Sequence, residues 1–405
     1  MAKNEIKFAS RKILACNWNN FSTTHNLYCM SNFQSMAIYA FSELESGKVK
    51  RIYASSRYPS KQTGNVFYDS DITPNLKFAD ELPLRLECLF SVVAFRPSHV
   101  LLSRDILGGK PLYYSLDMTF SSFKNYFESE PIEVLPGEVL KINYEGEIIE
   151  RKYYPFDDIF KKEKDVEVDE LVERIEKALL NFKPGFSCIA FSGGVDSSLL
   201  AAIYDVPLIS VTANEKEEEW IRYAAKVLGK EIEIFRFREK DVKEVVRDVN
   251  LAIETDDFLQ LSIAVPIYLA MKFAKSLGYS GIIFGQGADE LFGGYKRYEE
   301  LDYMQLEDEI LKDVRSLGEK NLVRDTKIAY KNEIKLIAPY LNWDVIRAAI
   351  SIPVEYKVAR VDGKVIRKYI LRKLAEKYLP KEIAWRDKKA IQYSTGVSKI
   401  LKKIL

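Results

Sequence analysis

The chain has 405 residues, of which 47% are hydrophobic and 29% are charged, with a formal net charge of +1. This length predicts about two or three domains, and the balanced charge gives no global footprint for nucleic acid or a membrane surface. The first residues lack the apolar core of a signal peptide, and no uncharged apolar run reaches the roughly 18 residues of a membrane span. The four cysteines form no CxxC pair, so no zinc site or disulfide framework is indicated and a cytoplasmic location is expected.

The first part of the chain reads as β-rich. Short apolar or alternating runs predict strands at residues 36–41, 89–95 and 99–103, with turn residues between them. Residues 134–142 predict two strand pieces around a Pro-Gly turn. A polar seam of charged residues follows at 157–165, and beyond it the pattern changes.

After the seam, helices and short apolar strands alternate. Apolar residues at helical spacing predict a helix over Val168–Leu180. The elements predicted after it are a buried strand at 187–191, a helix after Ser197, a strand at 208–211, a helix at 217–228 and a strand at 231–235. This βαβ order predicts a doubly wound parallel sheet, with a mostly helical extension after about Tyr295. We therefore expect two domains, at residues 1–158 and 165–405.

The segment Ser192-Gly193-Gly194-Val195-Asp196-Ser197-Ser198 lies between a predicted strand and a predicted helix. Its glycines let the backbone approach an anion closely, and the free N–H groups and dipole of the next helix favour negative charge. Serine hydroxyls add donors, while Asp196 can hold Mg²⁺ against phosphate oxygens. A plain turn with a capping serine would use some of these residues, but the full string favours a phosphate loop. Its candidate phosphate-binding residues are Ser192, Gly193, Gly194, Asp196, Ser197 and Ser198.

The loop lacks the lysine of a Walker A motif and resembles the pyrophosphate loop of the N-type ATP pyrophosphatases, which include the asparagine, NAD, GMP and argininosuccinate synthetases. The segment Gly285-Gln286-Gly287-Ala288-Asp289-Glu290-Leu291-Phe292-Gly293-Gly294-Tyr295 is similar to the G-x-G-[SA]-D-E-x-F-G-G-Y segment of asparagine synthetases and the related β-lactam synthetases. Further matches follow in order, so the resemblance covers most of residues 170–397. It implies that ATP is split into AMP and pyrophosphate to activate a carboxylate.

The resemblance also implies roles for single residues. Asp196 and Asp289 would bind Mg²⁺ between the phosphates of ATP, and Gly285 and Gly287 would line the nucleotide pocket. Lys368 aligns with a family lysine that would stabilise charge developing during adenylation. Without the resemblance, it would be one of many solvent-facing lysines.

The candidate catalytic residues are thus Lys368, Asp289 and Gln286, the last because of its place in the second segment. Three other basic residues are weaker candidates, since pairing with surface carboxylates explains them equally well: Arg372, Arg386 and Lys388.

The first half resembles only the framework of the family's glutaminase domain, an Ntn-hydrolase-like αββα sandwich that is here reduced. Residues 102–114 carry the resemblance to its A-R-D-x-x-G-x-x-P-L-Y-Y segment. Those glutaminases use an N-terminal cysteine whose own α-amine is the base, whereas here the second residue is Ala2, and Cys16, Cys29 and Cys88 are internal. Unless processing exposes Cys16, we expect a degenerate domain that does not hydrolyse glutamine.

Three departures from the family pattern fall in the second half. Gln286 stands where asparagine synthetases carry Glu and β-lactam synthetases carry Tyr, and a neutral amide cannot act as a general base. Ser262 replaces a usual Arg, and residues 335–342 lack the Glu, Arg and final Asp of the family's E-x-R-x-P-F-L-D. Drift with compensation explains these changes, and so does an altered substrate at the acceptor pocket around which we expect them to cluster.

The leading hypothesis is an asparagine synthetase-like amide ligase that uses ATP and Mg²⁺. The acceptor is a small carboxylate, aspartate by default, and the amine is ammonia or another amine, supplied free or by a separate partner. Alternatives are a β-lactam synthetase-like ligase with a non-aspartate acceptor and a nucleotide-binding paralogue without catalysis. Modification of nucleic acid is disfavoured, because no basic arm is evident. A homodimer is compatible with the sequence.

Overall fold

The computed structural model describes residues 38–45, 48–55, 60–319, 321–387 and 390–405. These residues belong to one compact unit, which spans Ser35–Leu405. Residues 1–37, and with them Ala2, Cys16 and Cys29, lie outside the described part.

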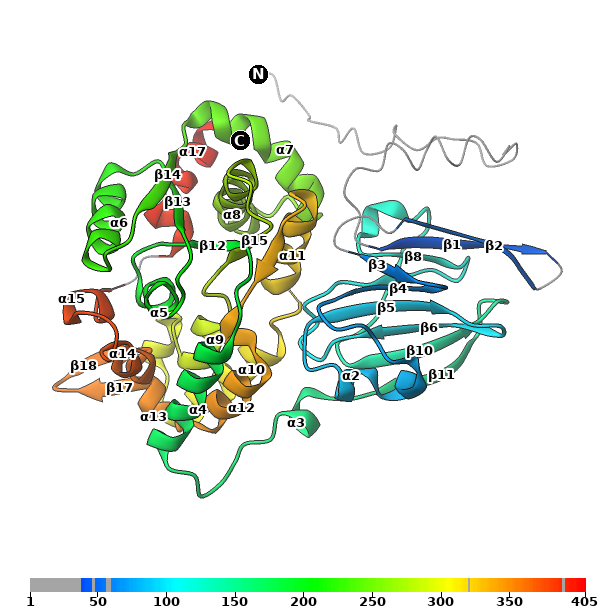
Figure 1. Cartoon of the computed structure of the whole chain (residues 1–405), viewed down its shortest axis with the longest axis horizontal. Coiled ribbons are helices and arrows are strands. Elements are labelled where there is room, and N and C mark those ends of the chain that lie inside the picture. Colours follow the sequence, from blue (N-terminus) through cyan, green and yellow to red (C-terminus); the bar gives the residue numbers. More distant parts are fainter. Residues whose placement is uncertain (1–37, 46–47, 56–59, 320, 388–389) are drawn as a thin grey trace, which may run out of the picture. The chain divides into compact units, whose positions relative to one another are not determined.

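Residues 39–153 form two antiparallel sheets (Figure 1). The first has the order β2 (Lys48–Ser55), β1 (Tyr39–Glu45), β8 (Thr119–Ser121), β7 (Tyr113–Tyr114) and β9 (Ile132–Glu133). The second has the order β11 (Ile148–Tyr153), β10 (Glu138–Asn143), β6 (His99–Arg104), β5 (Phe90–Phe95), β4 (Val66–Ser70) and β3 (Lys61–Thr63). Each strand pair is antiparallel, as short strands joined by tight turns favour.

An apolar core joins the two sheets. Phe95 of β5 and Phe120 of β8 meet edge to face, with ring centroids 5.8 Å apart. On the other face of the second sheet, Leu82 and Leu86 at the two ends of α2 (Leu82–Arg85) pack against β5, β6 and β10. Two packed sheets fit the predicted sandwich. Within the described part of residues 38–153, α2 is the α-helix that covers a sheet face, so the Ntn-like αββα assignment stays a prediction.

The second half contains a five-stranded sheet in which every pairing is parallel. Its order is β14 (Ile232–Arg236), β13 (Leu208–Thr212), β12 (Ser187–Ala190), β15 (Gly281–Ile283) and β16 (Lys335–Ile337). The chain winds outward from β12 to β14 and then returns to β15 on the other side of β12. In open α/β sheets the crevice at such a reversal, outside the carboxyl ends of the strands, is where ligands bind.

Helices cover both faces of this sheet (Figure 1). Successive strand residues point to opposite faces, so Ile189 and Ile283 enter one core while Cys188 and Ile282 enter the other. The first core includes α4 (Val168–Asn181), α5 (Val195–Ile203), α6 (Glu215–Val227), α9 (Ala288–Phe292), α10 (Tyr303–Arg315), α12 (Trp343–Ser351), α13 (Val354–Lys357), α14 (Tyr369–Ala375) and α15 (Lys381–Ala384). The second includes α7 (Glu239–Ile253), α8 (Phe258–Ser276), α11 (Asn321–Lys331), α16 (Ile391–Ser394) and α17 (Val397–Ile404). The predicted doubly wound sheet is confirmed.

Among the described residues, α8 is the one helix that is long and apolar enough to cross a membrane by length and composition. Inside the molecule, 61% of its 18-residue apolar stretch is buried. Its buried residues pack on β13 and β15 and against α7 and α11. Two lysines near its end, Lys272 and Lys275, keep the uncharged stretch short. A core helix accounts for this composition without a membrane.

Most predicted elements of the second half match within two residues. The helix expected over Val168–Leu180 is α4, because Leu171, Ile175 and Leu179 recur every four residues on one buried face. The prediction was wrong before Pro136, where β9 ends at Glu133 and no strand includes Val134 or Leu135. After Tyr295 the chain is mainly helical but also holds β16 and a hairpin of β17 (Val358–Val361) and β18 (Lys364–Arg367).

Candidate active site

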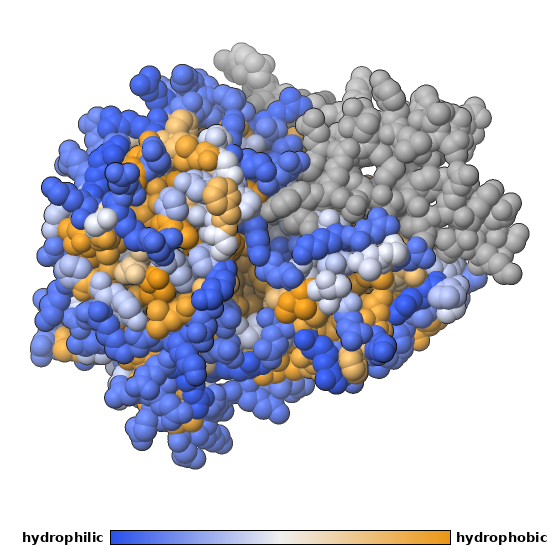
Figure 2. Space-filling model, viewed as in Figure 1, coloured by the Kyte–Doolittle hydropathy of each residue, from blue (hydrophilic) through white to orange (hydrophobic). Residues whose placement is uncertain are grey.

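A cavity of about 1550 Å³ opens where β12, β13 and β15 end, at the reversal of strand order. We call it the strand-end cavity. Residues after these three strands line it, together with side chains from α8, α9, α11 and α16. Figure 2 shows mostly hydrophilic residues on this face of the molecule, with apolar patches around α5 and the neighbouring strands. The position agrees with the general rule for ligand sites in open α/β sheets.

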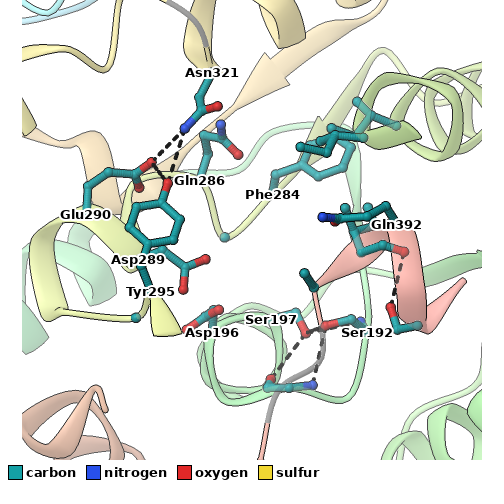
Figure 3. A pocket seen from close by; sticks show the side chains of 18 of the residues that line it. Ser192, Asp196, Ser197, Phe284, Gln286, Asp289, Glu290, Tyr295, Asn321 and Gln392 are labelled. Atoms are coloured by element: carbon teal, nitrogen blue, oxygen red, sulfur yellow. Dashed lines mark hydrogen bonds between the residues drawn. The ribbon is translucent and has the colours of Figure 1, made fainter. Parts of the chain in front are cut away.

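The predicted phosphate loop forms one wall of this cavity, between β12 and α5. The hydroxyls of Ser192 and Ser197 lie 3.0 Å apart, and the backbone N–H of Ser192 donates to Ser197 Oγ at 3.1 Å. The N-terminal turn of α5 begins after Gly194 and carries Asp196 and Ser197. Both residues line the cavity (Figure 3), so the positive end of the helix dipole faces it.

The carbonyl oxygens of the loop are held on its other side. Trp220 donates from Nε1 to Gly193 O at 3.0 Å, and Arg386 donates to Ser192 O at 3.2 Å. Arg386 also pairs with Glu217 at 3.0 Å and lies 4.4 Å from the Trp220 ring centroid. Gly193 has φ +63, and a Cβ there would lie 2.6 Å from Trp220 Nε1. Only glycine therefore fits this backbone and this contact.

Lys368 lies beneath the cavity between two carboxylates. Its Nζ donates to both oxygens of Asp196, at 2.7 and 2.8 Å, and lies 2.7 Å from Asp289 Oδ1. Lys368 is 2% exposed and Asp196 is 4% exposed, so solvent screens these contacts little. The three residues come from α5, α9 and the start of α14, and the structure brings together candidates 172 residues apart.

The backbone at this ion cluster is unusual in two places. Lys368 has φ +55, a left-handed conformation that costs a non-glycine residue about 1 kcal/mol or more. At Gly294, a Cβ would lie 1.9 Å from Asp289 Oδ1 and 2.2 Å from Lys368 Cε. Glycine at 294 and lysine at 368 are thus both required by the ion cluster. Tyr340 supports it from behind by donating to Asp196 O at 3.0 Å.

The donor set of Asp196 and Asp289 suits Mg²⁺, which proteins bind through one or two carboxylates together with substrate phosphates and water. Among the described residues, no group of three or more His, Cys, Asp or Glu could hold a metal ion by itself. A metal here would therefore need phosphate oxygens as further ligands. The neighbouring loop offers N–H and hydroxyl donors to the same phosphates.

A second polar cluster lines the far side of the cavity, which we call the acceptor end after the role predicted for Gln286. Gln286 lies near the carboxylate of Asp325, which accepts from Arg324 Nε at 2.7 Å. Arg324 donates to Gln260 Oε1 at 3.0 Å and to Asn321 Oδ1 at 3.3 Å. Burial raises the pKa of Asp325, while Arg324 and Gln286 stabilise its charged form.

Glu290 continues this cluster beside Asp289 (Figure 3). It accepts from the Tyr295 hydroxyl at 2.6 Å and from Asn321 Nδ2 at 3.2 Å. Burial raises the pKa of the Glu290 carboxyl, with the Asp289 charge adding to the rise. The acceptor end therefore consists of linked polar side chains from α8, α9 and α11 and the segments next to α9.

Not every predicted residue lines the cavity. Ser192, Gly194, Asp196, Ser197, Gly285, Gln286, Gly287 and Asp289 do so, whereas Gly193, Ser198 and Lys368 are not among its lining residues. Ser198 is fully buried behind the loop. Arg372, a weaker candidate, donates to the carbonyl oxygens of Ala384 and Arg386 and so holds the chain near the site. Lys388 lies outside the described residues.

We expected the three departures from the family pattern to cluster around the acceptor pocket. This expectation was wrong for all of them except Gln286, which lines the cavity. Ser262 donates to Leu259 O within α8, Lys335 pairs with Asp71, and Asn342 caps α12 by accepting from Asp344 N. None of these three lines the cavity. Asn342 does the capping that the family's Asp would also do, which explains that change by local structure alone.

Sequence reasoning missed Arg324, Asp325, Asn321 and Gln260 as site residues. Arg324 and Asp325 stand in a run of four consecutive polar residues on α11, a pattern typical of a solvated face, yet every residue from Leu322 to Tyr330 is buried. Their partners lie far away in the sequence, 64 residues in the case of Gln260. No feature of the sequence near Arg324 and Asp325 predicts that distant residues will satisfy their buried polar groups. Trp220 was also missed, although Arg386 had been a weak candidate.

Comparison with known proteins places the chain in a family. The profile of the asparagine synthase family matches residues 186–309 and 300–405, which is over half of the chain. A Methanocaldococcus jannaschii protein provisionally named asparagine synthetase 1 (glutamine-hydrolysing) is 32% identical over 327 residues, which cover 69% of this chain and 56% of that protein.

Plant proteins match as well. A glutamine-hydrolysing asparagine synthetase of Lotus japonicus is 29% identical over 230 residues, covering 52% of this chain and 39% of that protein. The aligned region thus spans about half the length of these relatives or less. A solved NH3-dependent NAD synthetase of Campylobacter jejuni aligns over 42% of this chain and 93% of its own, at 18% identity and a TM-score of 0.25.

Proposed function

Because the chain belongs to the asparagine synthase family, we propose that it is an AMP-forming carbon–nitrogen ligase. A carboxylate oxygen of the acceptor attacks the α-phosphorus of ATP, and pyrophosphate leaves. An amine then attacks the acyl carbon of the adenylate, loses a proton and displaces AMP. Activation is needed because a carboxylate repels nucleophiles and has no good leaving group.

The single observation that carries this proposal is the contact of Lys368 Nζ with both Asp196 and Asp289 at the phosphate loop. Adenylation brings the negative charges of the acceptor carboxylate and the ATP phosphates close to those of Asp196 and Asp289. Fixed cations and hydrogen-bond donors aimed at this charge lower the barrier to the reaction. Lys368 supplies the fixed cation, and the loop N–H groups and Ser192 and Ser197 supply the donors. Mg²⁺ held by Asp196 and Asp289 would neutralise phosphate charge.

Aspartate is the proposed acceptor, because the named relatives are asparagine synthetases. One observation favours a different acceptor as the second candidate. Gln286 lines the cavity and carries no charge, so this position offers the substrate an amide rather than a carboxylate. A non-aspartate acid, as in the β-lactam synthetases, is compatible with that arrangement.

Ammonia, rather than the amide of glutamine, is the proposed amine. A thiol that attacks glutamine needs a lowered pKa or an adjacent base. Of the two cysteines that the structure describes, Cys188 is fully buried, and burial raises its pKa to about 12. Burial also raises the pKa of Cys88. Neither has the character of a nucleophile.

Exchange of labelled pyrophosphate into ATP tests the proposal, measured with a panel of carboxylates that includes aspartate. Exchange that depends on aspartate, followed by asparagine formation with ammonium but not with glutamine, is the expected result. Exchange with another acid alone would favour the second candidate. ATP binding without exchange for any acid would identify a non-catalytic paralogue instead, and an absence of ATP binding would overturn both candidates.

A further inference from the structure

The strand-end cavity has a third side, opposite the acceptor end. Apolar residues line it, from the end of β13, from α8, from the residue after β15 and from α16: Val211, Pro266, Ile267, Phe284 and Ile391. We call it the base end. In Figure 3, Phe284 and Gln392 lie across the cavity from Asp289 and Glu290, and Ser192 and Ser197 lie along another side. A nucleotide with its phosphates at the loop would lay a flat apolar base here.

Gln392 is the carboxamide at this end, where the hydroxyl residues Ser210, Thr212 and Thr395 also line the cavity. Its side chain lines the cavity, the residue is 9% exposed, and it has no hydrogen-bond partner within the described parts of the chain. Buried amides in folded proteins nearly always have partners, because an unmet donor or acceptor is destabilising. The polar atoms of Gln392 are not fully enclosed by protein, so they reach the cavity, where a ligand can supply the partner.

The short helix α16 holds Gln392 in a fixed position. Ala213, just after β13, donates from its N–H to Thr395 O at 2.9 Å, and Asn214 Nδ2 donates to Ser394 O at 3.2 Å. Thr395 Oγ1 donates back to Ile391 O at 2.7 Å. Val397, which follows the helix, is fully buried in the same core as Val211. The amide is therefore presented by a well-supported turn.

We propose that Gln392 recognises the adenine edge of ATP and is the base-specificity residue of this site. A carboxamide offers one acceptor and two donors, which match the 6-amino group and a neighbouring ring nitrogen of adenine, the pairing that glutamine makes with adenine elsewhere. Phe284, Pro266 and Ile267 supply the apolar contacts for the ring faces. This inference rests on the proposed function, because it requires ATP to occupy the cavity.

Calorimetric binding to the full chain tests it, with three magnesium-saturated probes. ATP carries the 6-amino group, purine riboside triphosphate lacks it, and inorganic tripolyphosphate has no base. We expect wild type to bind ATP about tenfold more tightly than purine riboside triphosphate, as one lost hydrogen bond predicts. Gln392→Leu loses both hydrogen bonds, so it should bind the two nucleotides alike, with ATP weakened about a hundredfold, and should keep the wild-type affinity for tripolyphosphate.

Two further variants make the outcome decisive. Gln392→Glu keeps the size and polarity of the side chain but cannot donate to a ring nitrogen, so it should also weaken ATP binding if the leucine variant does not fold. Gln62→Leu, an exposed position on β3, is the matched control and should change nothing. A full ATP preference retained by Gln392→Leu, or wild-type ATP affinity retained by Gln392→Glu, would overturn the inference and leave the proposed function intact. Failure of wild type to bind ATP would overturn both.

Discussion

Two ends of the strand-end cavity hold their charges in different ways. At the phosphate end, the buried Lys368 contacts Asp196 and Asp289, which lie in the first turns of α5 and α9. At the acceptor end, Asp325 and Arg324 are neighbours on one helix, and Arg324 also hydrogen-bonds the neutral side chains of Gln260 and Asn321. The first arrangement concentrates charge at one point, whereas the second spreads it over linked side chains from several elements.

The difference has a consequence for substitutions. A change at the phosphate end removes one strong interaction with a reacting group, so the loss should fall on the chemical step. A change at the acceptor end alters several hydrogen bonds at once and leaves a buried partner unpaired, so stability and substrate affinity should suffer together. The following predictions separate these effects, in order of expected size.

The largest effect is expected for Lys368→Ala. The substitution removes the cation that contacts both Asp196 and Asp289, so that less positive charge offsets the two carboxylates and the phosphates. We predict a loss of about a thousandfold in the rate of pyrophosphate exchange, the scale of a lost charge-stabilising group, measured at saturating ATP.

Lys373, on the same helix but exposed and paired with Glu376 at 3.3 Å, provides the matched control. Lys373→Ala should exchange within about twofold of wild type, as expected for a weak surface pair. Exchange by Lys368→Ala within tenfold of wild type would remove Lys368 from the chemical step.

Asp325→Asn should have the next largest effect. It keeps the volume of the side chain but leaves Arg324 buried without its counter-charge, which costs about 3–5 kcal/mol in other buried pairs. We predict a lower melting temperature and a roughly 10- to 100-fold loss in kcat/KM for the acceptor, with the Kd for ATP nearly unchanged.

Asp308→Asn, at an exposed position on α10, controls for the change of charge. Steady-state kinetics against the acceptor and calorimetry with ATP give the two readouts. If Asp325→Asn weakened the use of the acceptor and the binding of ATP equally, the acceptor end and the phosphate end would not act independently.

The smallest effect concerns a second buried lysine. Lys357 is as buried as Lys368, each being 2% exposed, but no carboxylate within the described residues lies within ion-pair distance of it. Burial, with a contribution from the Lys162 charge, lowers the pKa of Lys357 to about 7 from the ordinary lysine value of 10.5. Between these two pH values the unfolded chain binds more protons than the folded one, so the free energy of unfolding rises with pH there.

Lys357→Met should therefore be more stable than wild type at pH 7, by about 1–4 kcal/mol, and the difference should shrink toward pH 10. Urea denaturation of both proteins across this range measures it, and exchange activity should not change. A constant difference across the range would show that the effect of the substitution is packing and not charge.

The sequence allowed the phosphate end to be predicted because its information is local. Ser192 to Ser198 place glycines, hydroxyls and a carboxylate between a strand and a helix, and the chemistry follows from that order. Lys368 was found only through a resemblance, since nothing near it in sequence distinguishes a buried lysine from an exposed one. Its left-handed backbone became visible in the structure alone.

The acceptor end and the base end could not be predicted in this way. Asp325 and Arg324 look like a solvated helix face, and the buried Arg324 finds a partner in Gln260, which comes from another element. Gln392 lies on a four-residue helix whose place is set by hydrogen bonds to residues after β13, about 180 residues earlier. Side-chain networks that close over such separations have no periodic signature in the sequence.

Transfer of an oxygen atom tests the central claim most directly. If the site forms an acyl-adenylate, an acceptor labelled with ¹⁸O in its carboxylate gives AMP that contains one labelled oxygen, because the bridging oxygen leaves with AMP when the amine attacks. Mass spectrometry of the nucleotide products after incubation with ATP and ammonium measures this transfer. Labelled AMP with unlabelled pyrophosphate is the predicted result, and label in inorganic phosphate alongside ADP would contradict the account.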